Sequence, residues 1–155
     1  MEMIEDTRST SMTPVRYVCF GLSLVGIPIT IYLTIAHFTS PGILACPSTG
    51  VIDCAKVTSS AQSYFLGIPV AILGLIYFVY LSVLNSPWGF RQASLRVPRL
   101  GSMVLGVAFV LWLVSAELLI INSICLWCTT VHVITVIIFA LVVYDYFVDS
   151  PARIQ

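Results

Sequence analysis

The sequence predicts an all-α integral membrane protein: a bundle of four transmembrane helices with an extracytoplasmic cysteine loop between helices 1 and 2. The first observation is composition, because 59% of the 155 residues are hydrophobic and 9% are charged, whereas a soluble domain is about half apolar and a quarter charged. The second is a set of four apolar stretches of a length suited to the roughly 30 Å hydrocarbon core of a bilayer. The formal net charge is zero, so the sequence shows no excess of basic residues of the kind that binds nucleic acid.

The predicted spans cover about residues 17–38, 66–84, 100–121 and 124–146. Together they form one membrane domain, residues 15–148, between tails at residues 1–14 and 149–155. The polar first tail is expected to be disordered. The first apolar stretch is longer than the roughly 7–15 residues of a signal-peptide core, so we predict a retained helix. Gly67 and Pro69 are a helix-start signal for the second span.

The basic residues predict the orientation of the bundle. With four spans, both termini and the connection at residues 85–99 lie on one side of the membrane. That side carries six arginines, whereas the other side has only Lys56. Basic residues concentrate on the cytoplasmic side of membrane proteins. We therefore expect a multi-pass protein of the cell membrane, with cytoplasmic termini and an extracytoplasmic cysteine loop.

Four of the five cysteines form two close pairs, which is typical of an oxidising compartment. Cys46 and Cys54 lie in the turn-rich segment 40–64, where Pro47 and Gly50 allow the chain to turn back far enough for a disulfide. The fifth, Cys19, is expected to be a small buried residue.

Cys125 and Cys128 form a Cys-x-x-Cys at the start of the last span, preceded by the helix N-cap candidates Asn122 and Ser123. The positive end of the helix dipole favours a thiolate in the first turn of a helix. This dithiol is therefore predicted to exchange electrons. Two alternatives remain: the four paired cysteines ligate zinc or copper, or they form static disulfides in a structural subunit. The outward placement disfavours a metal site, because oxidised cysteines bind no zinc.

A wider set of residues resembles the vitamin K epoxide reductase family, in its bacterial or archaeal form without a fused thioredoxin domain. The match consists of Cys46, Cys54, Ser60, the segment Leu66-Gly67-Ile68-Pro69, and Cys125-Leu126-Trp127-Cys128. It extends over residues 15–146. The similar oxidases of the DsbB type carry their Cys-x-x-Cys in the first outer loop, so the order found here disfavours them.

The resemblance implies an electron relay that supports disulfide formation in exported proteins. A thioredoxin-like or DsbA-like extracytoplasmic partner, acting in trans, would be oxidised by a Cys46–Cys54 disulfide through attack at Cys46. Cys54 would then attack Cys125, and the Cys125/Cys128 dithiol would reduce menaquinone or ubiquinone, with Cys128 nearest the ring. Ser60 resembles a loop serine that assists this exchange by hydrogen bonding.

Four further residues are candidates for the quinone site. Some family members hold the quinone with an Asn and a Tyr, and the matching positions here are Val70 and His132. His132 lies one helical turn beyond Cys128 and could supply the hydrogen bond or a proton. Glu117 either relays a proton or pairs within the bundle. Trp127 is either a ring that stacks on the quinone or an interfacial anchor.

Overall fold

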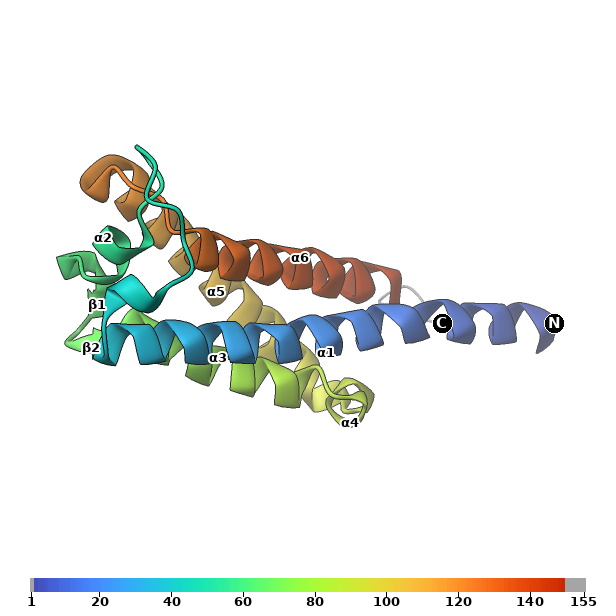
Figure 1. Cartoon of the computed structure of the whole chain (residues 1–155). Helices are drawn as coiled ribbons and strands as arrows, with labels where there is room; N and C mark the ends of the chain where they lie inside the picture. Colours follow the sequence, from blue (N-terminus) through green and yellow to red (C-terminus); the bar gives the residue numbers. More distant parts are fainter. Residues whose placement is uncertain (1, 150–155) are drawn as a thin grey trace.

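The computed structural model describes residues 2–149, and the side chains of residues 14–147. Four long helices run side by side in an elongated bundle (Figure 1): α1 (Glu2–Phe38), α3 (Val70–Leu84), α5 (Arg96–Ala116) and α6 (Leu126–Asp149). α1 packs against both α3 and α6, and α5 packs against α6. One π-helical turn, η4 (Glu117–Ile121), continues α5. The protein is therefore predominantly helical, as the composition predicted.

Within residues 2–149, three helices are long and apolar enough to cross a bilayer: Pro14–Phe38, Ala93–Ile121 and Leu126–Phe147. α3 is equally apolar but has 15 residues, fewer than the roughly 20 of a typical spanning helix. The chain is an integral membrane protein on these grounds, and a fourth span remains a prediction.

The N-terminal segment differs from its prediction, because α1 begins at Glu2 rather than after a disordered tail. Residues 2–13 contain neither glycine nor proline, and their acidic residues lie near the N-terminus, where the helix dipole favours negative charge. A helix already formed in the membrane extends at little cost, because only nucleation is unfavourable. The predicted C-terminal tail lies outside the described residues apart from Asp149, the last residue of α6.

The second span also begins later than predicted. Leu66 and Gly67 form the two-residue turn of a hairpin between β1 (Tyr64–Phe65) and β2 (Ile68–Pro69). Both turn residues have positive φ, 52° and 81°, as two-residue hairpin turns require. The helix-start signal at Gly67 and Pro69 therefore leads into the hairpin, and α3 starts immediately after it at Val70.

The end of the bundle near the N-terminus is closed by α4 (Pro87–Arg91) and η3 (Ala93–Leu95). Arg99 is buried there and donates hydrogen bonds to the carbonyl oxygens of Leu84 (2.8 Å) and Gly89 (2.7 Å). Its guanidinium lies 3.9 Å from the centroid of the Phe90 ring. This arginine, counted above for orientation, also anchors the connection between α3 and α5.

Close helix contacts surround the apolar core. Gly26 on α1 lets the Phe78 ring of α3 lie directly against the helix backbone, because a Cβ at this position would overlap the ring. Cys19 is fully buried in the same core, as expected, together with Leu81, Met103 and Ile138. The bundle thus has a packed half near the N-terminus, and the cysteine pairs lie at its other end.

Candidate functional site

The cysteine loop lies at the end of the bundle away from the N-terminus (Figure 1) and contains η1 (Pro41–Ile43), α2 (Cys54–Thr58) and η2 (Ala61–Ser63). Cys46 and Cys54 form a disulfide with Cα atoms 6.1 Å apart. The chain turns back at Gly50, whose φ is +57°. Cys46 is half-buried, whereas Cys54 is 2% exposed. Only the Cys46 side of this disulfide is therefore open to a protein partner.

The loop is hydrogen-bonded directly to the segment that precedes the Cys-x-x-Cys. Ile52 and Ile124 form a parallel bridge, in which the Asp53 amide donates to the Ile124 carbonyl (3.1 Å) and the Ile124 amide donates to the Val51 carbonyl (2.8 Å). Cys54 and Cys125 follow these residues and lie in one buried cluster. The fold thus brings together two cysteine pairs that lie some seventy residues apart in the sequence.

Cys125 is the residue that caps α6, and the prediction of Asn122 or Ser123 as the cap is wrong. The helix begins at Leu126, and the Cys128 amide donates to the Cys125 sulfur (3.3 Å). Asn122 instead ends η4 in the left-handed conformation, and Ser123 donates to the Asn122 carbonyl. The Cys128 amide stabilises negative charge on the Cys125 sulfur. This arrangement favours a Cys125 thiolate at the helix start.

Trp127 packs on the loop and is not among the residues that line the cavity described below. Its indole N–H donates to the Ala45 carbonyl (3.2 Å), and its ring meets Tyr32 edge-on, with centroids 5.1 Å apart. Successive helical residues point about 100° apart, so Trp127 and Cys128 face different sides of α6. Trp127 therefore contacts the residue before Cys46, and its role as a quinone-stacking ring stays a prediction.

Replacing Trp127 with phenylalanine is expected to loosen this part of the loop. The variant keeps a ring against Tyr32 but loses a hydrogen bond of about 1 kcal/mol, which corresponds to about fivefold more frequent local opening. Hydrogen exchange of the Ala45 amide, which donates to the Tyr32 hydroxyl (2.9 Å), measures this opening. Trp88→Phe, at an exposed site in α4, is the matched control. Unchanged exchange at Ala45 would show that the indole does not hold the loop.

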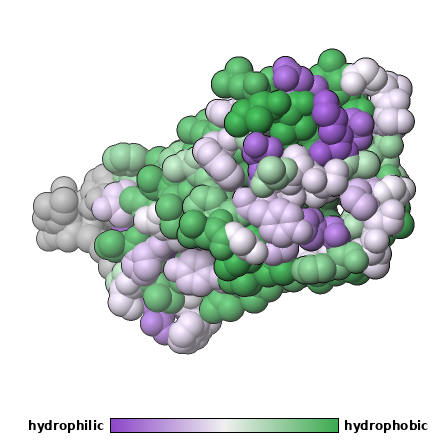
Figure 2. Space-filling model, turned by 90° about the vertical axis from the view of Figure 1, so that its left-hand side faces the viewer, coloured by the Kyte–Doolittle hydropathy of each residue, from purple (hydrophilic) through white to green (hydrophobic). Residues whose placement is uncertain are grey.

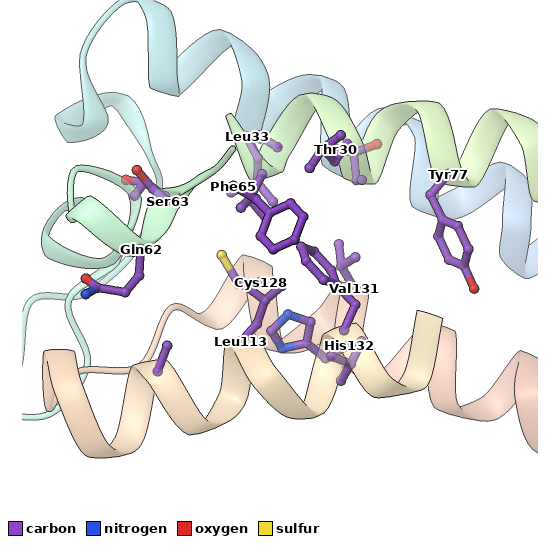
Figure 3. A pocket seen from close by; sticks show the side chains of 18 of the residues that line it. Thr30, Leu33, Gln62, Ser63, Phe65, Tyr77, Leu113, Cys128, Val131 and His132 are labelled. Carbon is purple, nitrogen blue, oxygen red and sulfur yellow. The ribbon is translucent and has the colours of Figure 1, made fainter. Parts of the chain in front are cut away.

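A cavity of about 500 Å³ lies among α1, α3, α5, α6 and the hairpin. Its walls are mostly apolar, and the Cys128 sulfur points into it (Figure 3). Figure 2, which looks onto the end of the molecule that carries the loop, shows hydrophilic residues interspersed among hydrophobic ones. The polar or ionisable side chains of the lining include His37, Thr58, Ser60, Gln62, Glu117 and His132.

The cavity brings together five of the predicted site residues: Cys128, His132, Val70, Glu117 and Ser60. His132 is 7% exposed, and its Nδ1 atom has no hydrogen-bond partner. A buried polar atom without a partner is costly, so this nitrogen is available to a ligand. The Ser60 hydroxyl donates to the Val57 carbonyl (2.7 Å). Val70 supplies only an apolar surface.

His37 also lines the cavity, although the sequence analysis did not select it. Its Nδ1 atom lies 3.2 Å from the Thr58 carbonyl and its Nε2 atom lies 3.0 Å from the Tyr64 hydroxyl. A carbonyl only accepts hydrogen bonds, so Nδ1 carries a proton and donates to Thr58. The sequence did contain a signal for this residue, because His37 is an ionisable residue at the outer end of a predicted span, and such residues are usually functional. His37 connects α1 to the loop and to the hairpin.

The metal alternative is not favoured by this arrangement. Cys46 and Cys54 are joined to each other, so they present no thiolates. Within residues 2–149, no three His, Cys, Asp or Glu side chains are grouped as metal ligands. Cys125 and Cys128 are free thiols, which also differs from a subunit with two static disulfides.

Comparison with protein-family models identifies a family. The model described as the vitamin K epoxide reductase family matches residues 17–143. The matched region includes both cysteine pairs, the hairpin and every cavity-lining residue named above.

Proposed function

Because the chain belongs to the vitamin K epoxide reductase family and is thus a membrane oxidoreductase that uses cysteines, we propose that it is a thiol–quinone oxidoreductase. It takes electrons from a thioredoxin-like or DsbA-like extracytoplasmic protein and delivers them to menaquinone or ubiquinone, so that exported proteins acquire disulfides. One observation carries the proposal: Cys54 packs in the same buried cluster as Cys125, while Cys128 lines an apolar cavity.

Electrons enter at Cys46. A thiolate of the reduced partner attacks the Cys46 sulfur, forms a mixed disulfide and releases Cys54 as a thiolate. The second thiol of the partner then resolves the mixed disulfide and releases Cys46. The exposure of Cys46 and the burial of Cys54 support this order, because only Cys46 can be reached by a folded protein.

The inner transfer runs from Cys54 to Cys125. When Cys125 and Cys128 are oxidised, the Cys54 thiolate attacks Cys125 and releases the Cys128 thiolate. Cys46 then attacks Cys54, so the loop disulfide re-forms and the Cys125/Cys128 pair is left reduced. The bridge between Ile52 and Ile124 supports this step, because it keeps the attacking and attacked residues adjacent. Ser60, near the end of α2, assists by hydrogen bonding.

The cavity residues fit a quinone ring. Ligand cavities of roughly 300–1,000 Å³ with apolar walls and few polar groups are typical of small-molecule sites, and this cavity has about 500 Å³. His132 Nδ1 supplies a polar atom that needs a partner, and Val70 adds apolar surface. When bound there, a quinone would accept two electrons and two protons. Cys128 is the sulfur that faces it, and His132 orients it by hydrogen bonding.

The same proposal includes the topology. We infer four spans, with α3 as the shortest, cytoplasmic termini and an extracytoplasmic loop. The arginines near α4 and the single Lys56 in the loop support this orientation.

The test is anaerobic quinone reduction by the purified protein. A reduced thioredoxin-like donor is supplied with menaquinone or ubiquinone analogues, and quinol and donor disulfide are both measured. The proposal expects one quinol for each donor disulfide formed. Absence of turnover with every quinone and with a competent donor, together with zinc or copper bound stoichiometrically by the cysteines, would replace the proposal with the metal alternative.

A further inference from the structure

Glu117 occupies an unusual place between the two halves of the site. It lies in the π-helical turn η4, is 6% exposed, and lines the same cavity as Cys128. Ile121, the last residue of the same turn, packs with Cys125 in one buried cluster, so the turn brings the Glu117 carboxylate near the Cys-x-x-Cys. Within the described part of the chain, this is the one buried carboxylate that lines the cavity.

The π-helical turn is what aims this side chain at the cysteines. The widened turn ends at Asn122, whose amide donates to the Glu117 carbonyl, as does the amide of Ser123 (3.1 Å). The chain thus folds back over Glu117 before it reaches Cys125. Irregular π-helical turns often occur at functional sites. Here the turn holds a carboxyl group against the start of α6.

The Glu117 carboxylate shares an apolar cavity with the Cys128 sulfur. Two neighbouring anions in apolar surroundings are costly, because little solvent stabilises either charge. A proton that moves from a thiol to the carboxylate avoids this cost, since the site keeps one negative charge throughout. The other ionisable groups that line the cavity are His37 on α1, Tyr77 on α3 and His132 on α6; of these, His37 is engaged with Thr58 and Tyr64.

We propose that Glu117 is the proton acceptor for the Cys125 thiol during oxidation of the Cys125/Cys128 pair. This inference rests on the proposed function and assigns the base within it. As the Cys125–Cys128 bond forms, two electrons pass to the quinone, the Cys128 proton passes to one quinone oxygen, and the Cys125 proton passes to the Glu117 carboxylate. Glu117 then gives its proton to a reduced quinone oxygen, so two protons and two electrons are transferred in all.

The decisive variant is Glu117→Gln, because glutamine has nearly the size and shape of glutamate but cannot take a proton. Quinone reduction driven by dithiothreitol should fall about 100-fold, as expected for the loss of a general base. Glu117→Asp, which keeps the acid, should recover part of the rate. Ser115→Ala, at an exposed position two residues earlier, is the matched control and should behave as the natural protein does.

A second measurement detects the proton on the Glu117 carboxyl group in the absence of quinone. The Cys125/Cys128 pair is oxidised by a small disulfide, and redox-difference infrared spectra are recorded. The proposal expects the C=O band of a protonated carboxyl group to appear on oxidation in the natural protein and to be absent in Glu117→Gln. A merely structural role would not produce this band.

The outcomes separate this inference from the proposed function. Natural protein that reduces no quinone would overturn the proposed function itself. Natural protein that turns over, with Glu117→Gln within about threefold of it, a difference too small for a lost general base, would overturn the role of Glu117 alone. So would an infrared spectrum in which Glu117 keeps the same protonation state in both redox states.

Discussion

Replacing Cys128 with alanine is expected to abolish quinone reduction with every electron donor, by at least about 10³-fold, as for the removal of a nucleophile. Cys128 is the sulfur that faces the apolar cavity, so no other thiol can reach a ring bound there. Cys125 is 0% exposed and cannot substitute for it. The measurement is anaerobic quinol formation with a protein donor and, separately, with dithiothreitol.

The fold of this variant is checked through the Cys46–Cys54 disulfide, which lies outside the substitution and should remain intact. Cys19→Ala is the matched control, because Cys19 is buried in the core at a distance from both pairs. It should retain activity. Quinol formation by Cys128→Ala at the natural rate would show that electrons leave the protein at another residue.

Replacing Cys46 with alanine is expected to affect quinone reduction differently with the two electron donors. Reduction of quinone by the thioredoxin-like protein should fall by about 10²-fold or more, because Cys54 is too buried for a folded partner to attack. Dithiothreitol is small enough to enter the cavity and reduce Cys128 there. With this donor, activity should stay within about fivefold of the natural protein, since dithiothreitol bypasses the loop and reduces the Cys125/Cys128 disulfide directly.

The comparison of donors on one variant is its own control, because a general loss of folding would affect both. Equal loss with both donors would show that dithiothreitol also enters through Cys46 and does not reduce the Cys125/Cys128 disulfide directly. Undiminished activity with the protein donor would mean that the partner enters at Cys54, and that the loop opens more than its burial indicates.

The main features of the fold could be predicted from the sequence because they depend on composition and local pattern. Stretches of apolar residues determine where helices lie in a membrane protein, since backbone groups in the bilayer must be hydrogen-bonded within the chain. The predicted last span begins within two residues of α6. The predicted second span begins four residues early, because Leu66 and Gly67 form a hairpin turn that hydropathy does not reveal.

The cysteine spacing identified the candidate site, but it does not show which way each side chain points. Trp127 and Cys128 are adjacent in the sequence and lie on the same helix, yet one faces the loop and the other the cavity. Which face points inward depends on how α6 packs against α1 and α5. That packing is a property of the assembled bundle and could not be obtained from the residues of α6 alone.

The sequence by itself determined that this is a helical membrane protein with two cysteine pairs, because hydrophobicity and cysteine content are local properties. Only the tertiary structure decided that Cys54 lies beside Cys125, through the bridge between Ile52 and Ile124, and that Glu117 lines the same cavity as Cys128. These contacts join segments that hydrogen-bond only after the helices have packed. Long-range pairing of this kind leaves no periodic signal in a single sequence.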